Sequence, residues 1–173
     1  DWQKGNLQEP RVEISSLTFP DTNLQTCVAE SGATYVHELD ELYCPDAGIT
    51  HLSGVENLTS LKKLGLWGNG VSDLAPILGL EQLEALYLQG NPLDYAALSQ
   101  LTPGHFPRLK SLFLSGEEDL FSHTSDVIDI VAAFTGLETL GMDGFGLTDA
   151  EFATLYSSAI EGRIGDFYGL ALW

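Results

Sequence analysis

Residues 61–74 read LKKLGLWGNGVSDL, and this stretch decides the fold. Its leucines occupy the first, fourth and sixth positions of the pattern L-x-x-L-x-L, and a glycine and an asparagine follow two and three residues after the last leucine. The pattern occurs six times in the 173 residues, with starts 22 to 30 residues apart. Repetition at this period indicates a solenoid, in which each repeat forms one coil of the chain. The copies begin at Leu39, Leu61, Leu83, Leu109, Leu137 and Phe167.

Each coil is predicted to contain a short strand, a turn and a return segment. A single coil cannot bury its own apolar side, so the leucines of successive coils stack into a shared core behind a parallel sheet. Asn69 and Asn91 occupy the ninth position of their repeats, where a side-chain amide can satisfy backbone groups of the turn. The return segments after Leu66 and Leu88 are short, which predicts 3₁₀ turns or helices of one or two turns.

Longer return segments follow the later strands and predict α-helices. Residues 125–134 carry apolar side chains at helical spacing. Thr148 and Glu151 have the spacing of a capping box, which predicts the start of another helix. A final strand is expected over residues 167–173, with an open edge beyond it. The side chains of the last helix that are expected to face the core are Phe152, Leu155 and Ile160.

Residues 61–74 resemble the bacterial internalin-type leucine-rich repeat nearly position by position. The longer units that follow are similar to the ribonuclease-inhibitor type, in which a full helix follows each strand. The resemblance covers residues 39–173 and implies an α/β leucine-rich repeat solenoid, with a parallel β-sheet on the concave face and 3₁₀ and α-helices on the convex face. Members of this family bind very diverse ligands. The resemblance therefore implies recognition without naming a partner, and its internalin part implies an exported bacterial protein.

The first 38 residues do not fit the repeat and are predicted to cap it. We expect one continuous domain with a cap over residues 1–38 and about six repeats over residues 39–173, because an uncovered first coil would expose core and a strand edge. Residues 12–19 alternate and contain β-forming side chains, which predicts a strand. Asp21 is a suitable N-cap for a helix that ends near Ala29.

The chain has two cysteines, Cys27 and Cys44, and the predicted register brings them together. Cys44 stands at an inward leucine position of the first repeat, and Cys27 lies on the inner side of the capping helix. We expect a disulfide between them, with two buried thiols as the alternative. A disulfide implies an oxidising compartment and hence a secreted or periplasmic protein. Free thiols would instead favour a regulatory scaffold in the cytosol.

The residues between the leucines should point outward along the concave face, because side chains alternate along a strand. One outward column contains Tyr43, Gly65, Tyr87, Phe113, Gly141 and Ala171, and the next contains Pro45, Trp67, Gln89, Ser115, Asp143 and Trp173. Exposed aromatic residues on adjacent strands indicate an interface for a protein or peptide. Gly65 is expected to leave a gap that admits a ligand side chain. The predicted binding residues are Tyr43, Trp67, Tyr87, Phe113, Gln89, Glu41 and Lys63.

Two alternatives remain open for these aromatic residues. In the first, they form a cross-strand ladder that only stabilises neighbouring strands. In the second, they stack on sugar rings, and the chain is a carbohydrate-binding module in which Glu41, Gln89 and Asp143 accept hydrogen bonds from hydroxyl groups.

The formal net charge of −18, from 25 acidic and 7 basic residues, argues against nucleic acid and anionic membranes as partners. No apolar run is long enough to insert into a bilayer. The sequence contains no G-x-S-x-G, P-loop or H-E-x-x-H motif, and its four histidines are scattered. We therefore predict a protein that is not an enzyme and has no cofactor or metal. The acidic run at residues 117–119 is expected to lie in a turn and to be solvated. Weak calcium binding is the alternative there, without the support of an EF-hand pattern.

Overall fold

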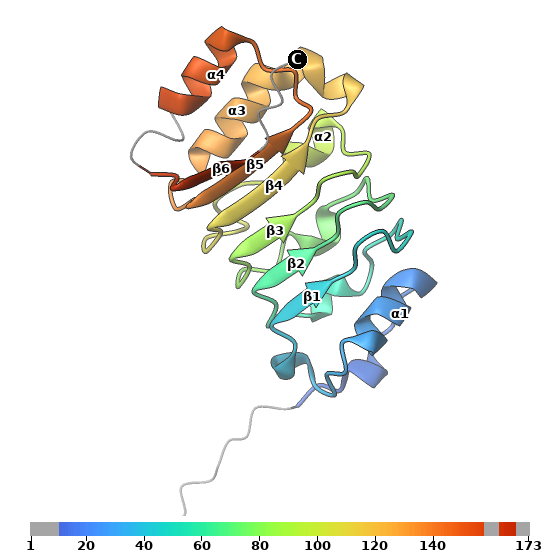
Figure 1. Cartoon of the computed structure of the whole chain (residues 1–173). Coiled ribbons are helices and arrows are strands. Elements are labelled where there is room, and N and C mark those ends of the chain that lie inside the picture. The colour runs from blue at the N-terminus through green and yellow to red at the C-terminus, as the bar shows by residue number, and fades with distance from the viewer. Residues whose placement is uncertain (1–10, 158–162, 169–173) are drawn as a thin grey trace, which may run out of the picture.

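Six strands form one parallel sheet in which neighbours in the sheet are neighbours in the chain (Figure 1). The structure is a computed structural model that describes residues 11–157 and 163–168. Each strand is three to five residues long and comes from a separate coil, as the repeat predicts. The strands are β1 (Glu41–Tyr43), β2 (Lys63–Gly65), β3 (Ala85–Tyr87), β4 (Ser111–Ser115), β5 (Thr139–Asp143) and β6 (Asp166–Tyr168).

Helical segments return the chain from each strand to the next and lie on one side of the sheet (Figure 1). The return after β2 contains the 3₁₀ helix η4 (Ala75–Ile77), and the return after β3 contains the one-turn helix α2 (Tyr95–Leu98). The longer returns after β4 and β5 contain α3 (Thr124–Ala133) and α4 (Asp149–Leu155). Both kinds of return are as predicted. The other elements are η1 (Ile14–Ser16), α1 (Thr22–Glu30), η2 (Val36–Glu38), η3 (Val55–Asn57) and η5 (Glu118–His123).

The predicted capping box opens α4. The hydroxyl of Thr148 accepts a hydrogen bond from the backbone N–H of Glu151, and the Glu151 carboxylate accepts one from the backbone N–H of Thr148 at 2.9 Å. Leu155 is fully buried, whereas Phe152 is only partly buried. Ile160, the third residue expected to face the core, lies outside the described residues.

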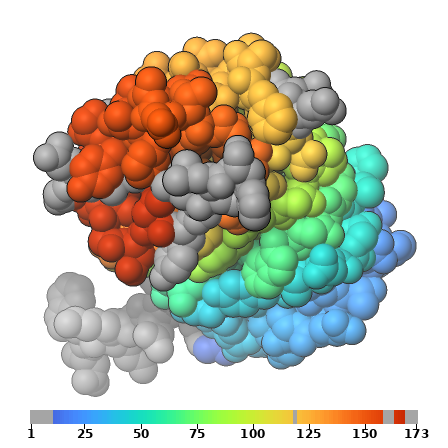
Figure 2. Space-filling view, turned by 45° about the horizontal axis from the view of Figure 1, so that its top comes forward, coloured from blue at the N-terminus to red at the C-terminus, as the bar shows by residue number. Residues whose placement is uncertain are grey.

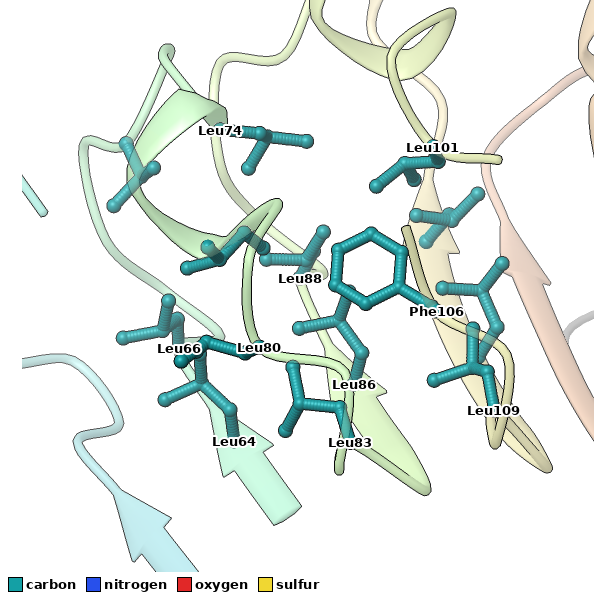
Figure 3. Packing of buried hydrophobic residues seen from close by; sticks show 14 of the residues in the cluster. Leu64, Leu66, Leu74, Leu80, Leu83, Leu86, Leu88, Leu101, Phe106 and Leu109 are labelled. Atoms are coloured by element: carbon teal, nitrogen blue, oxygen red, sulfur yellow. The ribbon is translucent and has the colours of Figure 1, made fainter. Parts of the chain in front are cut away.

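From β1 to β5, successive strands pair with leucine opposite leucine, and this register builds the core. Leu64 pairs with Leu42 on one side and with Leu86 on the other. All three side chains are at most 2% exposed, and they belong to one cluster that extends from α1 to α4. Each fully buried leucine contributes about 1.5–3 kcal/mol relative to an exposed one. Figure 3 shows the leucines of consecutive coils side by side, with Phe106 between them. Figure 2 shows the same coils as successive bands on the surface.

The register of the last unit differs from the prediction. Phe167 pairs with Leu140, so it occupies the middle leucine position rather than the first. The first position therefore falls on Ile164, and Tyr168 has the pairing with Gly141 that the predicted register gave to Ala171. Both frames, three residues apart, put apolar residues at most leucine positions, so the pattern alone did not distinguish them. Ala171 lies outside the described residues, as does the predicted remainder of this strand.

The side-chain amides of Asn69 and Asn91 satisfy backbone groups of the turns, as predicted, and they also link consecutive coils. The Asn69 Oδ1 accepts hydrogen bonds from the backbone N–H groups of Ala47 and Ile49, and its Nδ2 donates to the carbonyl groups of Cys44 and Leu66. Asn91 makes the corresponding hydrogen bonds one coil later. Its Oδ1 accepts from the backbone N–H of Val71, and its Nδ2 donates to the carbonyl groups of Leu66 and Leu88. Both amides are buried. These two side chains therefore satisfy backbone groups that the turns would otherwise leave unpaired.

The expected strand over residues 12–19 is wrong. Among the described residues of this stretch, Glu13 alone makes a β-bridge, which is antiparallel to Tyr35, and the next three residues form η1. The Ser16 hydroxyl donates to the carbonyl of Glu13 at 2.7 Å. This local side chain–backbone hydrogen bond accompanies a turn, which competes with an extended strand. The division of the chain into a cap and repeats at residue 38 stays a prediction, and residues 1–10 lie outside the described part.

Asp21 caps α1, as predicted, and also ties this helix to the first repeat. Its Oδ1 accepts hydrogen bonds from the N–H groups of Asn23 and Leu24, and its Oδ2 accepts from those of Thr50 and His51. Partial burial raises the pKa of Asp21, but the four N–H groups together lower it more, from 3.8 to about 2. The helix ends at Glu30, one residue beyond the expected end.

We expect the Asp21→Asn variant to be less stable than the wild type by about 1–2 kcal/mol at pH 7, after allowance for solvent screening. Since the pKa of Asp21 is lower in the folded than in the unfolded state, its stabilisation is complete above about pH 4 and is lost as the pH falls towards 2. Urea unfolding at pH 7, 4 and 3 should show the two proteins converging in stability. Asp129→Asn, on the exposed side of α3, is the matched control. A constant difference at all three pH values would contradict this assignment.

Candidate functional site

Four aromatic side chains meet on the outer face of the sheet, as the predicted columns require. In the register of the strands, Tyr43 lies beside Gly65, Gly65 beside Tyr87, and Tyr87 beside Phe113. The ring centroids of Tyr87 and Phe113 are 5.0 Å apart and those of Tyr43 and Tyr87 are 6.2 Å apart. Trp67, which follows β2, lies 6.1 Å from Tyr43 and 6.0 Å from Tyr87. We call Tyr43, Trp67, Tyr87 and Phe113 the aromatic wall.

The expected gap at Gly65 is filled, so that prediction is wrong. A Cβ atom on Gly65 would collide with the rings of Trp67 and Tyr43, which lean over the glycine from both sides. Gly141 is covered in the same way by the ring of Phe113. Both glycines therefore leave room for large rings over the sheet, and the rings of the wall cover it from β1 to β5. The sequence places each glycine directly beside an aromatic residue of the neighbouring coil, but it does not show the direction in which the ring leans.

We predict that Gly65→Ala displaces the rings of Trp67 and Tyr43 and destabilises the fold by about 1–3 kcal/mol, the usual cost of overpacking. Near-UV circular dichroism should change, because it reports the packing of these aromatic rings. Gly79→Ala is the matched control, since a Cβ atom there meets nothing within 4 Å. An unchanged near-UV spectrum for Gly65→Ala would show that the rings do not rest on this glycine.

A shallow hollow of about 470 Å³ lies against the wall. We call it the concave hollow, and its lining residues are Tyr43, Trp67, Tyr87, Phe113, Gln89 and Asp143. The Oε1 atom of Gln89 is buried and accepts no hydrogen bond from the described residues. An unpaired buried acceptor costs about 1–3 kcal/mol, which a donor entering the hollow would recover. The sequence placed Gln89 at this site, but not its unpaired oxygen, because that depends on the side-chain rotamer.

Glu41 and Lys63 were predicted for the site but do not line the hollow. The Lys63 Nζ forms a salt bridge of 2.8 Å with the Glu41 carboxylate, and this hydrogen bond raises the pKa of Lys63. Partial burial, followed by the negative charge of Glu41, raises the pKa of Tyr43. The Tyr43 hydroxyl is therefore protonated at neutral pH. The ion pair lies beside the wall with its charges mutually compensated, while the carboxylate of Asp143 faces the hollow from β5.

The predicted disulfide joins Cys27 of α1 to Cys44, directly after Tyr43. The Cα atoms are 5.9 Å apart. The bond attaches α1 to the first strand at the end of the aromatic wall. A second hollow of about 210 Å³ lies there and shares Tyr43 with the first; the disulfide forms part of its lining.

The other candidate groups do not assemble into a site. The four histidines remain apart: His37 stacks on Tyr35, and His123 stacks on Tyr95 with ring centroids 4.4 Å apart. Residues 11–157 and 163–168 contain no group of three His, Cys, Asp or Glu side chains that could hold a metal ion. Among the helices described there, none is long and apolar enough to cross a membrane.

Stacked coils with matched leucines, buried asparagines at the turns and a parallel sheet on one face define the leucine-rich repeat solenoid, and the chain has this fold. No known family profile matches it. It is similar to leucine-rich repeat-containing protein 56 of Rattus norvegicus, with 38% identity over 84 residues. The human protein of that name matches to the same extent. The match covers 48% of this chain but only 15% of those relatives.

The fold of the chain is also found among solved structures. An internalin, InlF, from Listeria monocytogenes superposes with a TM-score of 0.50 at 20% sequence identity. The superposition covers 93% of this chain and 59% of the internalin. This likeness concerns the fold, and it agrees with the repeat type that residues 61–74 resemble.

Proposed function

We propose that the chain is a non-catalytic recognition protein that binds a protein or peptide on the aromatic wall. Leucine-rich repeat proteins are generally protein-interaction modules, and their sheets offer extended concave surfaces. The observation that carries the proposal is the concave hollow, where aromatic rings lie beside an acceptor without a partner. Clustered aromatic residues are typical of the few positions that dominate binding energy in interfaces. In this proposal Glu41 and Lys63 form the rim, and the wall with Gln89 forms the centre.

We also propose that the protein works in an oxidising compartment, either secreted or periplasmic. The Cys27–Cys44 disulfide supports this, because such bonds persist outside the reducing cytosol. A cytosolic regulatory scaffold would need both thiols free. A bacterial source stays a prediction from the repeat type, since the relatives matched in sequence are mammalian.

The carbohydrate-binding alternative has less support from the geometry of the wall. Sugar rings stack on flat aromatic platforms, but the rings of Tyr43, Trp67 and Tyr87 are inclined to one another by 52–72°. Tyr87 and Phe113 are nearly parallel, at 22°, and stack on one another. The rings of the wall therefore do not form one flat platform.

The test compares what the wild-type chain and a Trp67→Ala/Tyr87→Ala variant capture from extracts. We expect the variant to stay folded, because neither side chain belongs to the core cluster, and to lose the partner. A Phe121→Ala/Tyr156→Ala variant removes two exposed aromatic residues at 53% and 49% exposure and should keep the partner. A glycan array forms the second arm. Capture of the same protein by all three chains would contradict the proposal, and glycan binding without a protein partner would favour the carbohydrate alternative.

A further inference from the structure

We propose that the concave hollow receives the guanidinium group of an arginine, and that the partner is therefore a basic protein segment. This inference rests on the proposed function and adds the chemistry of the ligand. Three observations point to it: the arrangement of the rings, the oxygen atoms beside them and the charge of the surrounding chain.

Three rings of the wall pack against one another and border the concave hollow. Tyr43, Trp67 and Tyr87 lie at mutual centroid distances of 6.0–6.2 Å, and their planes are inclined to one another by 52–72°. Each aromatic face carries negative electrostatic potential, so ring faces that border the hollow attract a cation to it. Arginine is the cation most often found in such contacts, because its planar guanidinium also stacks on aromatic faces.

The two other lining residues offer oxygen acceptors. The Oε1 of Gln89 is buried and without a donor among the described residues, and Asp143 brings an exposed carboxylate. A guanidinium carries five N–H donors and no acceptor, so it suits a hollow whose polar lining residues offer oxygen acceptors. A carboxylate or phosphate ligand would instead be repelled by the negative charge of Asp143, and its oxygens would bring lone pairs rather than donors to the Gln89 oxygen. An apolar side chain would leave the Gln89 oxygen unpaired.

The charge of the chain favours the same ligand. The formal net charge is −18, and the lysine beside the wall, Lys63, is already paired with Glu41 at 2.8 Å. A basic segment is therefore attracted both at long range and at the hollow. The negative charge of the chain would also attract lysine. The lysine ammonium, however, is a compact, strongly hydrated point charge without a planar face. The inclined rings and the two separated acceptors fit a planar fork with several donors better.

The experiment selects random twelve-residue peptides displayed on phage against the wild-type chain, after depletion on the Trp67→Ala/Tyr87→Ala variant. We expect the retained peptides to contain arginine. Replacing that arginine with lysine should weaken binding about 5–10-fold, and replacing it with neutral citrulline should weaken it about 30-fold or more, in keeping with a desolvated cation–π contact plus charge-assisted hydrogen bonds. Binding should weaken further as salt is raised.

Two variants of the chain test the acceptors. Asp143→Asn and Gln89→Leu should each weaken an arginine peptide about 5–10-fold, whereas Asp129→Asn on α3 should bind it as the wild type does. Gln89→Leu should not lose stability, because its oxygen has no partner to lose. Peptides that depend on Trp67 and Tyr87 but bind equally well with citrulline would overturn the arginine assignment and leave the proposed function standing. If no peptide distinguishes the wild type from the double variant, both proposals fail.

Discussion

Replacing Asn69 with alanine is expected to lower the free energy of unfolding by about 3 kcal/mol, since several buried backbone groups would lose their partners at once. The Asn69 amide accepts from two N–H groups and donates to the carbonyls of Cys44 and Leu66 at 2.7 and 2.8 Å. The side chain is 8% exposed, so water does not readily replace it. Urea unfolding followed by far-UV circular dichroism measures the change.

Asn57→Ala provides the matched control for this prediction. The Asn57 side chain lies in η3 and donates to the carbonyl of Gly54 at 3.2 Å. Its loss should cost less than about 1 kcal/mol, the usual net value of a hydrogen bond that is not deeply buried. Equal losses for the two alanine variants would show that Asn69 does not link the coils in the way described.

Removing the disulfide, in a Cys27→Ala/Cys44→Ala variant, is expected to cost about 3 kcal/mol in the chain-entropy model for a loop of this size. The bond closes a loop of 17 residues and attaches α1 to the first repeat. Amide hydrogen exchange should show the loss of protection first in α1, because the remaining coils keep their neighbours. Thermal unfolding with and without a reductant gives the size of the effect.

The double cysteine variant carries its own control, because a reductant should not change its stability further. A count of two free thiols on unreduced wild-type protein would contradict the bond, and with it the proposed oxidising compartment.

Much of the fold could be predicted because the repeat constrains it. Once leucines such as Leu64 and Leu86 stand at equal heights, side-chain alternation decides which residues face outward, and that reasoning also brought Cys27 to Cys44. Helices that begin with a local sequence signal could also be predicted, as the Thr148–Glu151 capping box at the start of α4 shows. The register of the last unit could not be predicted, because two frames put apolar residues inward. Only the pairing with Leu140 distinguishes the two frames.

Side-chain packing limited how much of the candidate site could be predicted from the sequence. The sequence brought Tyr43, Trp67, Tyr87 and Phe113 together, because their columns follow from the backbone alone. It could not show that two rings cover Gly65, nor that the Gln89 oxygen is unpaired, since both depend on rotamers chosen by neighbouring coils. The strand expected at residues 12–19 failed for a related reason: alternation of side chains does not supply a neighbouring strand to pair with.

The most direct test of the central claim is the dissociation constant of the captured partner for three purified chains: wild type, Trp67→Ala/Tyr87→Ala and Phe121→Ala/Tyr156→Ala. Since truncating a central aromatic residue of an interface typically costs about 2 kcal/mol or more, the first variant should bind at least about 100-fold more weakly. The second variant should bind as the wild type does. Equal affinities for all three folded chains would mean that the partner does not bind the aromatic wall.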